Sequence, residues 1–128
     1  MRINDARDEL FTALGGAGLV AIGWERKNFV PPVAIVVPAE PFIDTDGETT
    51  FTEPFAVHYV VQLVAGRGTG DTVQDKLAEM IEAATLALHG IGMSIDAVEY
   101  PLISGEDEKL TIGAQVVVTA TINLKEDV

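Results

Sequence analysis

The segment at 110–124 alternates apolar and polar positions, and this alternation constrains the fold more than any other feature of the chain. Because successive side chains of a strand point to opposite faces, the pattern predicts a long strand with one buried face and one open face. Threonine, glutamine and asparagine predominate on the open side. The apolar side consists of Leu110, Ile112, Ala114, Val116, Val118, Ala120, Ile122 and Leu124.

The other segments show helical or strand periods. Apolar residues at helical spacing predict a short helix over 4–14 and an amphipathic helix over 71–89. We expect Asp71 and Gln74 to form a capping box at the start of the second helix. Prolines flank the apolar run at 33–37, which indicates a short strand or one at the sheet edge. Apolar or alternating runs predict strands over 19–22, 33–37, 55–65, 93–103 and 110–124.

This order, α-β-β-β-α-β-β, predicts an α+β fold. We expect a two-layer sandwich in which two helices cover one face of a mostly antiparallel sheet. The length of 128 residues suits a single domain over 1–128. Residues 39–54 are predicted to be a long loop, or a β-hairpin arm that turns at Asp46-Gly47 and pairs Phe42 with Phe51.

Charge and composition exclude several functional classes. The chain has 20 acidic and 8 basic residues, a net charge of −12, which disfavours specific nucleic-acid binding because such binding neutralises phosphates. No apolar run approaches the roughly 20 residues that span a bilayer, so we expect no membrane association. Acidic residues within 4–9 leave no apolar core for a signal peptide. The absence of cysteine excludes disulfides, thiolate metal sites and cysteine nucleophiles.

One glycine-rich segment and one acidic segment are candidate ligand sites. The glycine-rich turn at 66–70 precedes a predicted helix, but it lacks the spacing of a phosphate loop, and Asp71 would repel an anion. Asp44, Asp46 and Glu48 place alternating carboxylates on a turn without the remaining ligands of an EF-hand. A solvated acidic turn is the simpler interpretation, and cation binding there stays open.

Histidines and serines give no catalytic motif. His58 and His89 are too few for the usual three protein ligands of catalytic zinc, and His89 suits the negative end of a helix. Ser94 and Ser104 lie outside any G-x-S-x-G pattern. We therefore expect no enzymatic activity, no cofactor and no metal.

The layout of the chain resembles the tail terminator, or tail completion, proteins of siphophages. The resemblance spans nearly the whole chain and rests on the order of segments rather than on a motif. Its parts are the helix at 4–14 followed by Gly15-Gly16, the proline-bracketed strand and loop at 31–54, the strand-to-helix passage at 58–89, and the closing strands at 95–101 and 110–124.

The resemblance implies a structural role in the virion. Such proteins form a hexameric ring on the last ring of the tail tube, end its polymerisation and provide the docking surface for the head connector or stopper protein. The implied partners are further copies of the chain, the tail tube protein and that connector. The implied location is the tail or neck, after assembly in the host cytoplasm. DNA would pass through the lumen, where an acidic wall keeps it from adhering.

The residues expected to contact other subunits or partners are the polar residues of the open sheet face and the aromatic residues of the predicted loop. They are Phe42, Phe51, Gln62, Gln115, Thr119, Thr121 and Asn123. Two alternatives stay open: another head–tail adaptor or tail tube protein, and a small-ligand-binding α+β domain that uses the turn at 66–70. An enzyme with an unrecognised pair of carboxylates has no positive support in the sequence.

Overall fold

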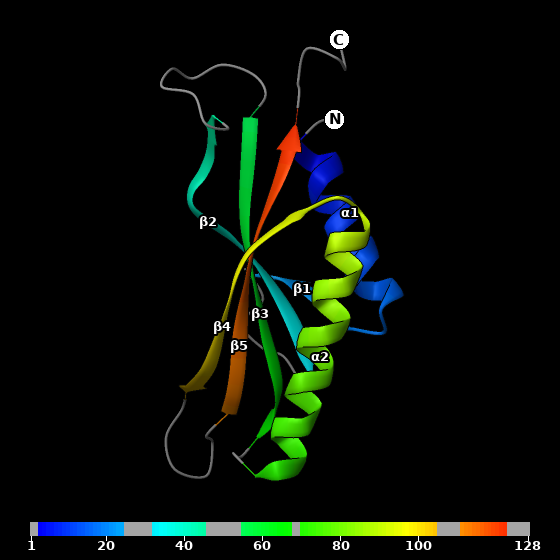
Figure 1. The fold of residues 1–128 in the computed structure, drawn as a ribbon, viewed down its shortest axis with the longest axis vertical. Helices are drawn as coiled ribbons and strands as arrows, with labels where there is room; N and C mark the ends of the chain where they lie inside the picture. Colours follow the sequence, from blue (N-terminus) through cyan, green and yellow to red (C-terminus); the bar gives the residue numbers. More distant parts are fainter. Residues whose placement is uncertain (1–2, 25–31, 46–54, 68–69, 105–110, 123–128) are drawn as a thin grey trace.

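The computed structural model of the chain describes residues 3–24, 32–45, 55–67, 70–104 and 111–122. It is an α+β fold with two helices on one face of a five-stranded sheet (Figure 1). The predicted fold class and element order are confirmed. The elements are α1 (Ile3–Gly16), β1 (Ala21–Gly23), β2 (Val33–Thr45), β3 (Phe55–Arg67), α2 (Asp71–Gly90), β4 (Ser94–Ser104) and β5 (Thr111–Ile122).

The sheet has the strand order β1-β2-β3-β5-β4. All neighbouring strands run antiparallel except β1 and β2, which pair in parallel over three residues, Ala21–Gly23 against Ala34–Val36. The two strands with the clearest alternation, β3 and β5, lie side by side near the centre (Figure 1). A central position explains their pattern, because both of their edges are paired and only their faces differ in environment.

The hydrophobic core lies between the helices and one face of this sheet. On β3 the odd-numbered residues from Val57 to Ala65 are buried, and on β5 the even-numbered ones from Ala114 to Ile122. Their register sets Val57 against Ala120 and Val61 against Val116. The helices add side chains that are almost completely buried, at helical spacing: Ala6, Leu10, Leu14, Leu77, Met80, Ala84 and Leu88.

Strand β2 differs from its predicted form. The prolines predict a short strand or one at the sheet edge, but β2 is long and lies second in the sheet. It continues from Val33 through Pro38 and Pro41 to Thr45, and β1 covers its outer edge only at Ala34–Val36. A register shift between Pro38 and Ile43 accommodates the prolines, and pairing with β3 then resumes. Residues 39–45, predicted as loop or arm, are therefore part of the sheet. Residues 46–54, with the Asp46-Gly47 turn and Phe51, lie outside the described residues.

The helix ends also differ from the predicted caps. Gly70, not Asp71, is the N-cap of α2, and no side chain caps this end, so the predicted capping box with Gln74 is wrong. Helix α1 continues through Gly15 and Gly16, and the left-handed residue that follows it is Gly18, with φ of 86°. Gly92, with φ of 85°, plays the same role after α2. Glycine adopts such φ values at little cost, so these two glycines let the chain turn away after the end of each helix.

Candidate functional site

The sheet face opposite the helices carries four of the predicted interface residues. Both helices pack on the core face, and no described helix or strand lies over the other face (Figure 1). Gln62 and Gln115 are cross-strand partners there, and Thr119 and Thr121 follow along β5. Thr121 is exposed and the other three are half-buried. Asn123, the last residue predicted for this face, lies outside the described residues.

A chain of polar side chains crosses this open face from β2 to β4. His58 Nε2 lies 2.8 Å from Asp44 Oδ1, and His58 Nδ1 lies 2.9 Å from Thr119 Oγ1. The Thr119 hydroxyl donates to Asp96, and the Ser94 hydroxyl donates to the same carboxylate at 3.3 Å. One network thus ties β2, β3, β5 and β4 together. The interpretation of Asp44 as part of a solvated turn is wrong, because it lies in a paired strand and binds His58.

The donors in this network can be counted. Thr119 has a single hydroxyl hydrogen, which is directed to Asp96, so its oxygen accepts from His58 Nδ1. The second ring nitrogen, Nε2, faces Asp44 Oδ1, and the tautomer of the imidazole sets which nitrogen donates.

The same count decides what the network can do chemically. An acid, an imidazole and a hydroxyl in sequence are the parts of a nucleophilic triad, in which the imidazole accepts the hydroxyl proton. Here the Thr119 hydroxyl donates to Asp96, so its hydrogen is directed away from His58. The network is therefore a cross-strand clamp, and it gives no support for hydrolytic chemistry.

Thr119 is the residue whose removal tests this clamp. We expect Thr119→Val to lower the free energy of unfolding by about 1–2 kcal/mol, because it keeps the shape of the side chain and breaks two hydrogen bonds to His58 and Asp96. Thr121→Val, two residues along the same face, is the matched control and should change it by less than about 0.5 kcal/mol. Urea unfolding of both variants measures the difference, and equal effects would show that the bonds contribute nothing to stability.

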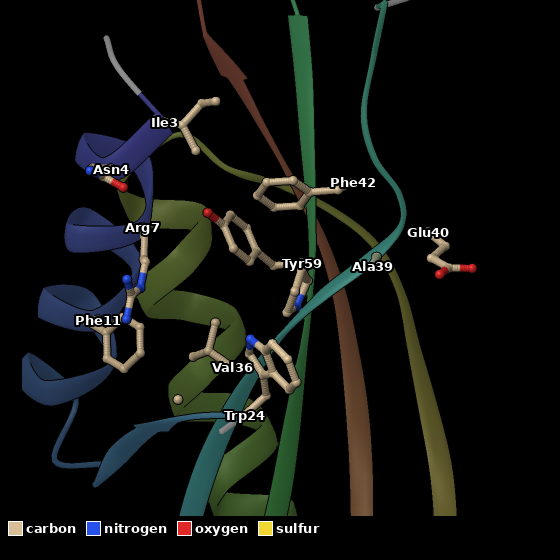
Figure 2. A pocket seen from close by; sticks show the side chains of 12 residues that line it. Ile3, Asn4, Arg7, Phe11, Trp24, Val36, Ala39, Glu40, Phe42 and Tyr59 are labelled. Atoms are coloured by element: carbon tan, nitrogen blue, oxygen red, sulfur yellow. The ribbon is translucent and has the colours of Figure 1, made fainter. Parts of the chain in front are cut away.

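The core side of the sheet contains a groove of about 860 Å³ between α1 and β2. β1 ends at Gly23 while β2 continues, so no strand among the described residues lies beside the outer part of β2 at this place. Four of its twelve lining residues are aromatic, one is the cation Arg7, and the side chain of Glu40 points away from the rings (Figure 2). The residues that define this aromatic groove are Arg7, Phe11, Trp24, Glu40, Phe42 and Tyr59.

Phe42 belongs to this groove and not to the open face. Its ring meets that of Tyr59 edge-to-face, with centroids 5.4 Å apart. The predicted pairing with Phe51 cannot be placed, since Phe51 lies outside the described residues. Burial raises the pKa of the Tyr59 phenol above 10.0, and the nearby Arg7 guanidinium opposes that shift. The positive charge of Arg7 therefore acts on the Tyr59 hydroxyl, which lines the groove.

Arg7 is held by an aromatic ring. Its guanidinium carbon lies 5.5 Å from the centre of the Phe11 ring, one helical turn further along α1 (Figure 2). Within the described part of the chain, no carboxylate lies within 4.0 Å of this guanidinium. A cation stacked on a ring keeps most of its hydrogen-bond donors available to another molecule.

The remaining candidates from the sequence do not gather into a site. His89 is exposed at the end of α2. Residues 68–69 of the glycine-rich turn, with Asp46 and Glu48, lie outside the described residues, and nothing is described of the Ser104 side chain. No group of three or more potential metal ligands occurs among the residues that the structure describes. Within the same residues, neither helix has the length and apolar character needed to cross a membrane.

Sequence reasoning missed both the clamp and the groove. The members of the clamp are far apart in sequence, and His58 and Thr119 are separated by 61 positions. The one local signal for the groove was its aromatic content, since Trp24 and Phe42 lie in segments interpreted as connections. Comparison of the chain with models of known protein families found no match, and comparison with curated proteins found no similar sequence.

Proposed function

We propose that the protein is a structural subunit that closes into a hexameric ring on a phage tail tube, ends tube polymerisation and presents the docking surface for the head connector. The observation that carries this proposal is the open sheet face. Four strands contribute to it, and it joins polar side chains such as Gln62 and Gln115 to half-buried valines such as Val60 and Val117. A mixed surface of this kind is typical of protein interfaces.

The layout of the fold is a second support. Its element order is the one on which the resemblance of the sequence to tail terminator proteins rests. The net charge of −12 suits a lumen through which DNA slides without adhering. A ring subunit makes head-to-tail contacts that close, so it needs two different surfaces. The open sheet face offers one such surface.

The mass in solution tests the ring. Six copies of a 13.6 kDa chain weigh about 82 kDa, and we expect this closed species in size-exclusion chromatography with light scattering over a concentration series. Gln115→Lys, which places a charge on the open face, should reduce its population. Thr12→Lys, at an exposed position on α1, is the matched control and should not. A chain that stays monomeric at all concentrations, and does not bind the end of purified tail tubes in electron micrographs, would contradict the proposal.

The main alternative is another head–tail adaptor or a tail tube protein of a phage or phage-like particle. A tube subunit would give open polymers that lengthen with concentration, whereas a terminator gives a species of fixed mass. The same light-scattering experiment separates the two.

A further inference from the structure

The aromatic groove has the composition of a protein-binding hot spot. Tryptophan, tyrosine and arginine are the residue types that most often dominate the binding energy of protein interfaces, and the groove contains Trp24, Tyr59 and Arg7. Trp24 is 62% exposed at its mouth, which leaves a large apolar surface in water. The groove is therefore suited to an apolar side chain that arrives with a negative charge for Arg7.

The backbone beside the groove is less suited to strand addition. The outer edge of β2 beyond Val36 has no paired strand among the described residues, and such edges can accept an extended peptide. However, Pro38 and Pro41 lie in this stretch and lack N–H donors. Recognition at the groove is thus expected to depend on side chains.

Helix α2 carries a surface that complements the groove. Its outer stripe places acidic residues one turn apart and ends in a leucine: Asp75, Glu79, Glu82 and Leu86. Leu86 is 74% exposed, the highest value for a large hydrophobic residue in the described part of the chain. Glu82 precedes it by one turn, so the two side chains lie on the same face of the helix.

We propose that the aromatic groove of one copy of the chain receives α2 of a second copy, with Leu86 among the aromatic rings and Glu82 paired with Arg7. Charge complementarity selects this occupant. The groove presents a guanidinium without a carboxylate partner among the described residues, and the α2 stripe presents carboxylates beside its one exposed leucine.

The contact is head-to-tail, because the groove lies between α1 and β2 while the stripe lies on the exposed side of α2. The copy that inserts α2 keeps a free groove and the copy that receives it keeps a free stripe, so the contact repeats until a ring closes. This inference deepens the proposed ring function, but it can be tested without assuming a hexamer.

The absence of cysteine from the chain allows a direct test by cross-linking. One chain carries Ala39→Cys in the groove, and another carries Leu86→Cys on the stripe. We expect a short bis-maleimide to join the two chains in an equimolar mixture and to give a ladder of higher species with a chain that carries both changes. Thr12→Cys in place of Leu86→Cys, at an exposed position on α1, is the control for random collision.

A charge exchange identifies the ion pair within the same assay. Arg7→Glu in the groove chain should lower the yield of cross-linked product at least tenfold. Glu82→Arg in the stripe chain should restore most of that yield. A yield no higher than that of the Thr12→Cys control, or one that Arg7→Glu leaves unchanged, would overturn the contact. Cross-linking of Leu86→Cys chains to one another would also overturn it, because that marks a symmetric helix contact.

The outcome separates this contact from the ring proposal. If a species of about 82 kDa forms but no cross-linked product appears, the ring proposal is retained and the contact between the groove and α2 is rejected. A cross-linked ladder without a closed species of that mass would retain the contact and reject the hexamer. Each variant should unfold at the same temperature as the parent chain, which shows that a lower yield of cross-linked product does not come from unfolding.

Discussion

Leu88→Ala should lower the free energy of unfolding by about 3 kcal/mol, while Leu86→Ala, two residues earlier on the same helix, should change it by less than about 0.5 kcal/mol. Leu88 is fully buried against the sheet, so its truncation removes apolar contacts and leaves a cavity. Leu86 is 74% exposed, and its truncation removes little that is buried within one copy. The pair thus separates the role of α2 in the fold from its proposed role between copies.

Urea unfolding at low protein concentration, where association is weakest, measures both variants. At high concentration, Leu86→Ala should in addition reduce the population of assembled species, while Leu88→Ala acts through stability. If Leu86→Ala lowered the stability of the dilute chain as much as Leu88→Ala, α2 would not pack with Leu88 against the sheet and Leu86 in solvent.

Gly113→Ala should destabilise the protein by about 2–3 kcal/mol. A Cβ atom at Gly113 would lie 2.6 Å from the carbonyl oxygen of Leu63 on the neighbouring strand, closer than these atoms can approach. Here the β3–β5 register shifts between Val64 and Gly66, which brings the two backbones together. Because the clashing atom is backbone, a side-chain rotation cannot relieve the contact, and the sheet must shift.

Gly66→Ala is the matched control for that prediction. It lies at the same register shift, but a Cβ atom there would meet only the Val73 side chain at 3.8 Å, an ordinary contact. We expect a change below about 1 kcal/mol. Thermal unfolding of both variants gives the comparison, and equal loss of stability would mean that the close approach at Gly113 does not constrain the sheet.

Two surfaces of the chain remain without a partner in the described structure. One is the open sheet face, where the clamp from Asp44 to Asp96 fixes the relative positions of four strands. The other is the aromatic groove between α1 and β2. They lie on different sides of the sheet, so a subunit can use both at once. A ring that must hold its neighbours and also sit on a tube requires more than one contact surface.

The sequence by itself determined the order of the helices and strands and the buried faces of α2 and β5. The alternation of β5 and the helical spacing of α2 are local patterns, and they follow directly from the geometry of a strand or helix. The fold class was predictable for the same reason, since two amphipathic helices and a half-open antiparallel sheet have few ways to bury their apolar faces. The missing side-chain cap at Gly70 shows where a local pattern fails, because the backbone can enter a helix without it.

Only the tertiary structure decided which distant residues meet. The extension of β2 through Pro38 depends on pairing with β3, which overrides the tendency of proline to end a strand. The meeting of His58 with Thr119 depends on the register between two strands, and a slip of one residue would turn either side chain to the other face. The groove depends on where β1 stops relative to β2. Strand register and strand length are long-range properties, set by the whole sheet and its packing against the helices, and no short segment of the chain encodes them.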